Sequence, residues 1–242
     1  MAQAKTMELV GKRALGANAC WLDFDLPKDL EFAGSQFLIV DTGLRLQDGS
    51  PVKRCFSISS PDTKQRSIEL AILKVGDGTR ALADLPLGAE VTFSGPWGKL
   101  SPGADDPLAP ALVVATDSGI TSALGLLRGR AMGRHLKRTT FLWLDHGPSA
   151  LLPRETGSNL LPAGLGRFET ADIPAVGSPG RAGEALRALE QLEVDVTHES
   201  SIWLMGDGDL LHPIKESLLA KVAGLDPARV RLECFFNNPN RR

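Results

Sequence analysis

The sequence contains no tyrosine, and aromatic residues make up only 5% of its 242 residues. No apolar run approaches the roughly 20 residues that a membrane-spanning helix needs. The 27 basic and 29 acidic residues nearly cancel, and neither half of the chain carries a basic excess. A nucleic-acid binder or a protein of anionic membrane surfaces would show such an excess. We therefore expect no membrane span and no nucleic-acid partner.

The chain is also poor in cysteine, with three residues (Cys20, Cys55 and Cys234) spread over its length. They form no C-x-x-C pair, so the sequence predicts neither a disulfide framework nor an iron–sulfur or zinc site. The four histidines share no metal-ligand spacing, and no metal site is predicted. The first residues lack the apolar core of a signal peptide. Together these absences favour a protein of a reducing compartment, and we expect it in the cytoplasm.

The first hundred residues predict short strands separated by turns, with one short helix. Closing a sheet of short antiparallel strands removes its edges, so we expect a small antiparallel β-barrel. The expected strands are Cys20–Leu26, Phe37–Val40, Cys55–Ile58, Ile68–Leu73 and Val91–Phe93, and the helix is Thr79–Leu85.

The pattern changes after the Pro- and Gly-rich segment Pro102–Pro107, where strands alternate with helices. Such alternation predicts a doubly wound α/β domain with a parallel sheet covered on both faces. We therefore predict two domains, residues 1–104 and residues 105–242. Residues 151–178 are rich in Gly and Pro and are assigned to no element except one strand. The expected strands are Ala111–Thr116, Thr140–Leu144, Phe168–Ala171, Ser201–Met205 and Val230–Phe236, and the helices are Ile120–Met132, Ala182–Leu192 and Leu210–Ala223.

Two segments of the first domain have the chemistry of a flavin site. Arg54, Phe56 and Ser57 follow one another on one strand. A guanidinium binds phosphate in a fork, an aromatic ring stacks on a planar ring, and a hydroxyl bonds a ring nitrogen. The Gly76–Thr79 loop opens a helix whose N–H groups suit a pyrophosphate. An edge strand with a surface arginine and a plain turn are the alternative interpretations.

The order of these segments resembles the ferredoxin–NADP reductase superfamily, in which a flavin-binding barrel precedes a nicotinamide-binding α/β domain. The Arg-x-aromatic-Ser pattern is matched by Arg54, Phe56 and Ser57, and a later Gly-Pro-x-Gly pattern by Gly95–Gly98. The resemblance implies that Arg54 binds a flavin phosphate, that Phe56 stacks on the flavin ring and that Ser57 bonds near its N5. It also implies that Gly78 and Thr79 hold the pyrophosphate, with FAD favoured over FMN.

The second domain departs further from that family. Its Gly-Thr-Gly-Ile-Thr-Pro turn corresponds to residues 117–122, beginning with Asp117. By resemblance, the nicotinamide nucleotide would contact the residues Thr116, Gly119, Thr121, Gly206 and Asp207. The carboxylate of Asp117 is expected to oppose a pyrophosphate, and Asp207 is alternatively a helix N-cap. The family's arginine for a 2′-phosphate is missing after His146-Gly147-Pro148-Ser149, which favours NADH over NADPH.

The C-terminal segment Glu233–Phe236 resembles the family's Glu-x-Phe ending, which lies near the flavin ring. The resemblance implies a catalytic role for Glu233 beside Ser57, and a contact of Phe236 with the cofactors. A carboxylate on an apolar strand needs a partner or a role. A buried last strand explains the phenylalanines equally well.

These features predict an FAD-dependent oxidoreductase that passes electrons from NAD(P)H to a separate acceptor, such as a ferredoxin or an oxygenase component. A ferric-siderophore reductase is one alternative, because Asp117 and the Gly206-Asp207 pair resemble the turns of siderophore-interacting proteins. A flavin-carrying electron-transfer subunit with a degenerate nicotinamide site is a second alternative. A flavin-free binding module that keeps only the fold is a third.

Overall fold

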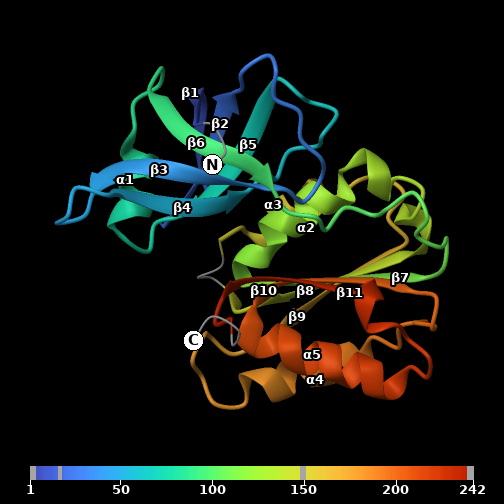
Figure 1. Ribbon diagram of the computed structural model, residues 1–242. Coiled ribbons are helices and arrows are strands. Elements are labelled where there is room, and N and C mark those ends of the chain that lie inside the picture. The colour runs from blue at the N-terminus through green and yellow to red at the C-terminus, as the bar shows by residue number, and fades with distance from the viewer. Residues whose placement is uncertain (1–3, 16–17, 148–150, 239–242) are drawn as a thin grey trace.

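A computed structural model describes residues 4–15, 18–147 and 151–238, which fold around two β-sheets (Figure 1). The first sheet uses the N-terminal part of the chain and the second the C-terminal part. The predicted fold class is confirmed, and the boundary between residues 104 and 105 stays a prediction. None of the described helices has the length and apolar character needed to cross a membrane.

The first sheet is antiparallel and barrel-like, with the strand order β4-β3-β6-β1-β2-β5. Its ladder is open between β4 and β5, where a hydrogen bond from Ser59 N to Glu69 O (3.0 Å) links the two edges. The sequence patterns missed β1, because only Met7 and Leu9 of its ten residues are buried. The strands are β1 (Lys5–Ala14), β2 (Ala19–Asp25), β3 (Phe37–Arg45), β4 (Pro51–Ser57), β5 (Ser67–Leu73) and β6 (Glu90–Trp97), with helix α1 (Asp77–Asp84) between β5 and β6.

The second sheet is parallel, with the strand order β11-β10-β7-β8-β9. Its chain runs outward from β7 in one direction through β8 and β9, and then in the other direction through β10 and β11. The strand order therefore reverses between β7 and β10, the point at which open α/β sheets bind their ligands. The strands are β7 (Ala111–Thr116), β8 (Thr139–Asp145), β9 (Arg167–Asp172), β10 (Ser201–Asp207) and β11 (Val230–Phe236).

Helices cover both faces of the parallel sheet (Figure 1). Helix α2 (Ile120–Leu127) lies on the face toward the first sheet, and all of its residues are buried. Helices α4 (Arg181–Gln191) and α5 (Gly208–Lys221) pack on the other face. The prediction of one helix over Ile120–Met132 was wrong at its end, because Gly129 breaks the α-helical path and a 3₁₀ turn follows. The short helix α3 (Arg154–Asn159) lies in the segment that the sequence left unassigned.

Two glycine-rich backbones meet where α2 approaches the first domain. A Cβ on Gly125 would lie 2.2 Å from the carbonyl oxygen of Ile58, and a Cβ on Gly34 would lie 2.5 Å from the carbonyl oxygen of Gly125. A Cβ on Gly129 would lie 3.1 Å from the Cα of Gly34. We call the contact of Gly34, Ile58, Gly125 and Gly129 the interdomain seam. Only glycine permits backbones to approach this closely.

Polar contacts reinforce the seam on both sides. Arg128 donates from Nη1 to the carbonyl oxygen of Ser59 (2.8 Å) and pairs with Glu69 Oε2 (3.3 Å). The buried carboxylate of Asp62 accepts from the backbone N–H groups of Gly34 (3.2 Å) and Arg130 (2.9 Å). The end of β4 is thereby held against the parallel-sheet domain.

We predict that Gly125→Ala lowers the free energy of unfolding by about 1–3 kcal/mol, because the added methyl group overpacks the seam. Thermal or denaturant unfolding measures this change. Gly183→Ala in α4 is the matched control: its Cβ would have no neighbour within 4 Å. The control should gain up to about 1 kcal/mol from helix propensity. Equal stability of the Gly125→Ala variant and the native chain would contradict the close backbone packing at the seam.

Candidate functional site

The predicted flavin-binding side chains lie at the edge strand β4. Arg54 is exposed, and its guanidinium donates to the carbonyl oxygen of Lys53 (2.8 Å). Phe56 is half-buried and packs against the core of the first domain. Ser57 is buried, with 7% of its surface exposed. Since side chains alternate along a strand, Arg54 and Phe56 share one face of β4 and Ser57 lies on the other.

Helix α1 packs against β3 and β4, which places the Gly76–Thr79 loop beside the strand of Arg54. The hydroxyl of Thr79 donates to the carbonyl oxygen of Gly76 (2.9 Å) and accepts from its N–H (3.1 Å). A side chain at Gly78 would crowd Thr42, because an added Cβ would lie 3.1 Å from Thr42 Cγ2. At Gly76 a Cβ would meet nothing within 4 Å, so the loop borders open space.

These residues fit FAD. The first N–H groups of a helix have no acceptor within it and favour an anion. They stand next to an exposed guanidinium and a half-buried aromatic ring, the donors and the surface that a pyrophosphate and a flavin ring need. Helix α1 contacts β4, the strand that carries Ser57, while the individual roles of these residues stay predictions.

We predict that Arg54→Ala weakens FAD binding tenfold to a hundredfold, equivalent to about 1.5–3 kcal/mol for one charge-assisted contact. Fluorescence titration of the apoprotein measures the dissociation constant. Arg45→Ala removes the same charge from β3, where Arg45 pairs with Asp41 (3.0 Å), and should leave FAD affinity unchanged. If both variants lose the same affinity, Arg54 has no specific contact with the cofactor.

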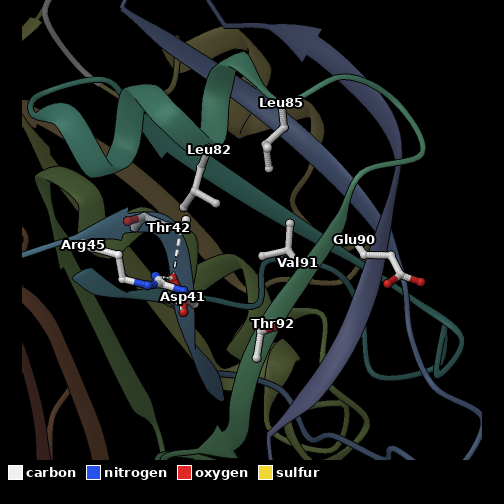
Figure 2. Close-up of a pocket in the computed structure, with 9 residues that line it drawn as sticks. Asp41, Thr42, Arg45, Leu82, Leu85, Glu90, Val91 and Thr92 are labelled. Atoms are coloured by element: carbon white, nitrogen blue, oxygen red, sulfur yellow. Dashed lines mark hydrogen bonds and ion pairs between the residues drawn. The ribbon is translucent and has the colours of Figure 1, made fainter. Parts of the chain in front are cut away.

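A separate hollow of about 150 Å³ lies between α1, β3 and β6 (Figure 2). Leu82, Leu85 and Val91 line its apolar side, and the Asp41–Arg45 ion pair lies at its polar side. Asp41 and Arg45 already pair with each other, and the hollow contains none of the predicted site residues. We assign it no function.

The turn after β7 and the turn after β10 touch at the point where the strand order reverses. A Cβ on Gly119 would lie 2.1 Å from the carbonyl oxygen of Met205, and one on Gly206 would lie 2.3 Å from that of Thr116. The Thr116 hydroxyl accepts from Asp207 N (2.8 Å), and the Thr121 hydroxyl donates to Ser118 O (2.8 Å). The structure thus brings these predicted residues together. Close backbone packing already explains both glycines, and their contact with a nucleotide stays a prediction.

A buried ionic cluster occupies the same place. Asp117 has a left-handed backbone (φ 51°) and is 7% exposed. Its carboxylate accepts from Arg181 Nη2, and its other oxygen lies 2.8 Å from Nδ1 of His146. Arg181 is 5% exposed, donates to the carbonyl oxygen of Pro174, and has its Nε 3.4 Å from Asp207 Oδ2. We call Asp117, Arg181 and Asp207 the Asp–Arg–Asp bridge.

Asp207 has further partners that confirm its reading as a helix N-cap. Its Oδ1 accepts from the backbone N–H of Asp209 (3.1 Å), in the first turn of α5, and from Nδ2 of Asn237 (3.0 Å). A nucleotide phosphate at this crevice must therefore compete with carboxylates for Arg181. Pro148 and Ser149, which bear on the choice between NADH and NADPH, lie outside the described residues.

The sequence patterns missed Arg181, because it begins a helix directly after the unassigned Gly- and Pro-rich segment. They also missed Asp145, the buried last residue of β8. Burial raises the pKa of the Asp145 carboxyl, while the nearby Arg154 (3.7 Å) opposes this rise. One sequence signal could have indicated this acidic cluster. The strands β8, β9 and β10 all end in aspartate, and Asp117 follows β7 directly.

Glu233 lies on β11, opposite Met205 of β10, and its Oε2 accepts a hydrogen bond from the hydroxyl of Ser122 (2.9 Å). Burial raises the pKa of Glu233 to about 7, and the bond from Ser122 opposes this rise. Ser122 is on α2, one turn from the seam residue Gly125, which adjoins Ile58 next to Ser57. Helix α2 therefore contacts the neighbourhoods of both predicted catalytic residues, Ser57 and Glu233. Phe236 lies two strand positions beyond Cys234 and is half-buried.

We predict that Glu233 makes the protein less stable as the pH rises from about 4.5 to 7. In this range the folded state holds a proton that the unfolded state has released, so ionisation favours unfolding. Glu233→Gln removes this dependence and should gain up to about 3 kcal/mol over the native chain by pH 7. The exposed Glu199→Gln variant is the control. Parallel stability curves for Glu233→Gln and the native chain would show that Glu233 ionises normally.

Comparisons with known proteins agree with this geometry. Residues 6–101 match the family model described as the oxidoreductase FAD-binding domain. No curated protein sequence matches the chain.

Several solved structures share the whole two-domain fold at low identity. A ferredoxin NADP⁺ reductase from Neisseria gonorrhoeae, with bound FAD and NADP, has a TM-score of 0.75 at 17% identity, covering 98% of this chain and 100% of that one. A siderophore-interacting protein from Acinetobacter baumannii has a TM-score of 0.73 at 13% identity, covering 97% and 90%. The ferredoxin reductase of carbazole 1,9a-dioxygenase has a TM-score of 0.75 at 16% identity, covering 97% and 70%. The predicted resemblance, the fold class and the assignment to the flavin-dependent oxidoreductases are confirmed.

Proposed function

We propose that this chain, a flavin-dependent oxidoreductase with the ferredoxin–NADP reductase fold, passes electrons from NAD(P)H to a separate acceptor. Bound FAD would supply the conversion between the two electrons of a hydride and the single electrons of such an acceptor. The observation that carries the proposal is the match of residues 6–101 to an FAD-binding domain, with Arg54, Phe56 and the α1 N-terminus together in that domain.

The roles of the side chains follow from their surroundings. Arg54 and the N–H groups of the Gly76–Thr79 loop bind phosphate, and Phe56 offers its ring face to a planar ring system. Ser57, buried beside the seam, offers a hydroxyl to a ring atom. Glu233 is half-protonated near pH 7, so its carboxyl holds an exchangeable proton, and Ser122 fixes the direction of that carboxyl.

We propose a protein acceptor, a ferredoxin or an oxygenase component, because the sequence provides no cysteine set for an in-chain iron–sulfur cluster. The location in the cytoplasm stays a prediction. A ferric-siderophore reductase is the second candidate, which the likeness to the Acinetobacter baumannii protein and the buried Asp117 favour. A flavin-carrying subunit without a nicotinamide site is the third candidate, because the Asp–Arg–Asp bridge occupies the crevice between β7 and β10.

Anaerobic addition of NADH to the flavin-loaded protein tests the proposal. We expect the visible flavin band to bleach, with NADH more effective than NADPH. Ser57→Ala should slow this bleaching while the flavin stays bound. If dithionite bleaches the flavin and both nucleotides fail, the carrier-subunit interpretation replaces the reductase.

The reduced protein then distinguishes between the two candidate acceptors, a ferredoxin and a ferric siderophore. Reoxidation by an added ferredoxin, without effect of a ferric siderophore, supports the main proposal. The reverse result supports the siderophore reductase.

A further inference from the structure

We infer that Asp117 acts as a built-in competitor for nucleotide phosphate by holding Arg181, so that the crevice between β7 and β10 contains a masked anion site. The inference rests on the proposed nicotinamide donor and concerns the regulation of its site by this chain's own residues. The sequence predicted only that the Asp117 charge opposes a pyrophosphate. The structure adds that the Asp117 carboxylate pairs with Arg181, a cation that is then not available to the phosphate.

The position of the bridge carries the first step. Ligands of open α/β sheets bind outside the carboxyl ends of the strands where the strand order reverses. Here that point lies between the ends of β7 and β10, and the Arg181 guanidinium spans from Asp117 at one end to Asp207 at the other. Arg181 thus stands where a ligand is expected. It is the first residue of helix α4, which packs on the face of the parallel sheet away from the first sheet.

A cavity beside the bridge carries the second step. It has a volume of about 470 Å³ and lies between the first turns of α4 and α5. Arg181 and Asp207 line it, together with Ser178 and Asn237. Arg181 Nε is buried without a hydrogen-bond acceptor, because the Asp207 oxygen at 3.4 Å is an ion-pair partner with poor geometry. The cavity and a donor without an acceptor, Arg181 Nε, therefore lie side by side.

The partners of Asp207 and Asp117 differ, which makes Asp117 the competitor. Asp207 is also fixed by Asp209 N and Asn237, so it stays in place without Arg181. Asp117 takes a left-handed backbone that costs energy for most residues and is tolerated by asparagine. Its Oδ2 accepts from Arg181 Nη2, a charge-assisted contact that a phosphate oxygen can make as well. A diphosphate that displaces Asp117 would gain the same contact.

Replacing Asp117 should therefore unmask the site. Asp117→Asn keeps the size and the backbone conformation but no longer neutralises Arg181. We expect the flavin-loaded variant to bind ADP-ribose, the probe without a nicotinamide ring, at least about tenfold tighter than the native chain. Isothermal titration calorimetry measures this affinity without any redox reaction.

Two further variants separate unmasking from simple charge repulsion. Asp172→Asn removes a carboxylate from the end of β9 that pairs with Arg154 (2.5 Å), and we expect no change in affinity. The double variant Asp117→Asn/Arg181→Met should return to native affinity. Met keeps the length of the Arg181 side chain, and Asp207 keeps its hydrogen bonds from Asp209 N and Asn237 Nδ2.

The inference fails if Asp117→Asn binds ADP-ribose no tighter than the native chain. It also fails if the double variant keeps the gain, or if Asp172→Asn shows an equal gain, because repulsion alone then explains the effect. Should the double variant not fold, the comparison of Asp117→Asn with Asp172→Asn still decides. Loss of flavin bleaching by NADH would count against the proposed function and leave the ADP-ribose result intact.

Discussion

The interdomain seam fixes how the two sheets face each other, and the predicted flavin site depends on it. Gly125 of α2 lies against the carbonyl oxygen of Ile58, closer than any side chain permits. That contact holds the end of β4, with Ser57, beside the helix whose Ser122 bonds Glu233. A shift at the seam would separate Ser57, in the first domain, from Ser122 and Glu233, in the second.

Electrostatics distinguishes the two halves of the molecule. The edge of β4 presents an exposed arginine and a helix N-terminus, both open to an anion. At the parallel sheet, by contrast, the buried Arg181 already has carboxylate partners. The predicted phosphate donors of the first domain are thus open, whereas the buried cation of the second domain already has carboxylate partners. The match of residues 6–101 to an FAD-binding domain makes the flavin the better supported cofactor.

The local patterns predicted most elements of the fold because burial follows the same periodicity as the sequence. The strands Ala111–Thr116 and Val230–Phe236 were predicted with their observed bounds. β1 was missed because only two of its ten residues, Met7 and Leu9, are buried. The end of α2 was misjudged because Gly129, just beyond its last residue, packs against Gly34 of the first domain, a contact that no local pattern records.

The sequence could propose candidate site residues where they form a contiguous motif, as at Arg54–Ser57 and Gly76–Thr79, and their roles stay predictions. Contacts between distant segments were not. Arg181 meets Asp117 across 64 residues, and Ser122 meets Glu233 across 111 residues. The pairing of His146 with Asp117 likewise needs the neighbouring ends of β7 and β8. Such pairs exist only once the sheet order is known.

The central claim is that β4 and α1 form an FAD site in this chain. Titration of the folded apoprotein with FAD, followed by the quenching of flavin fluorescence, tests it most directly. We expect saturation at one FAD per chain. A chain that is folded by circular dichroism and leaves the fluorescence of added FAD unchanged would contradict the claim.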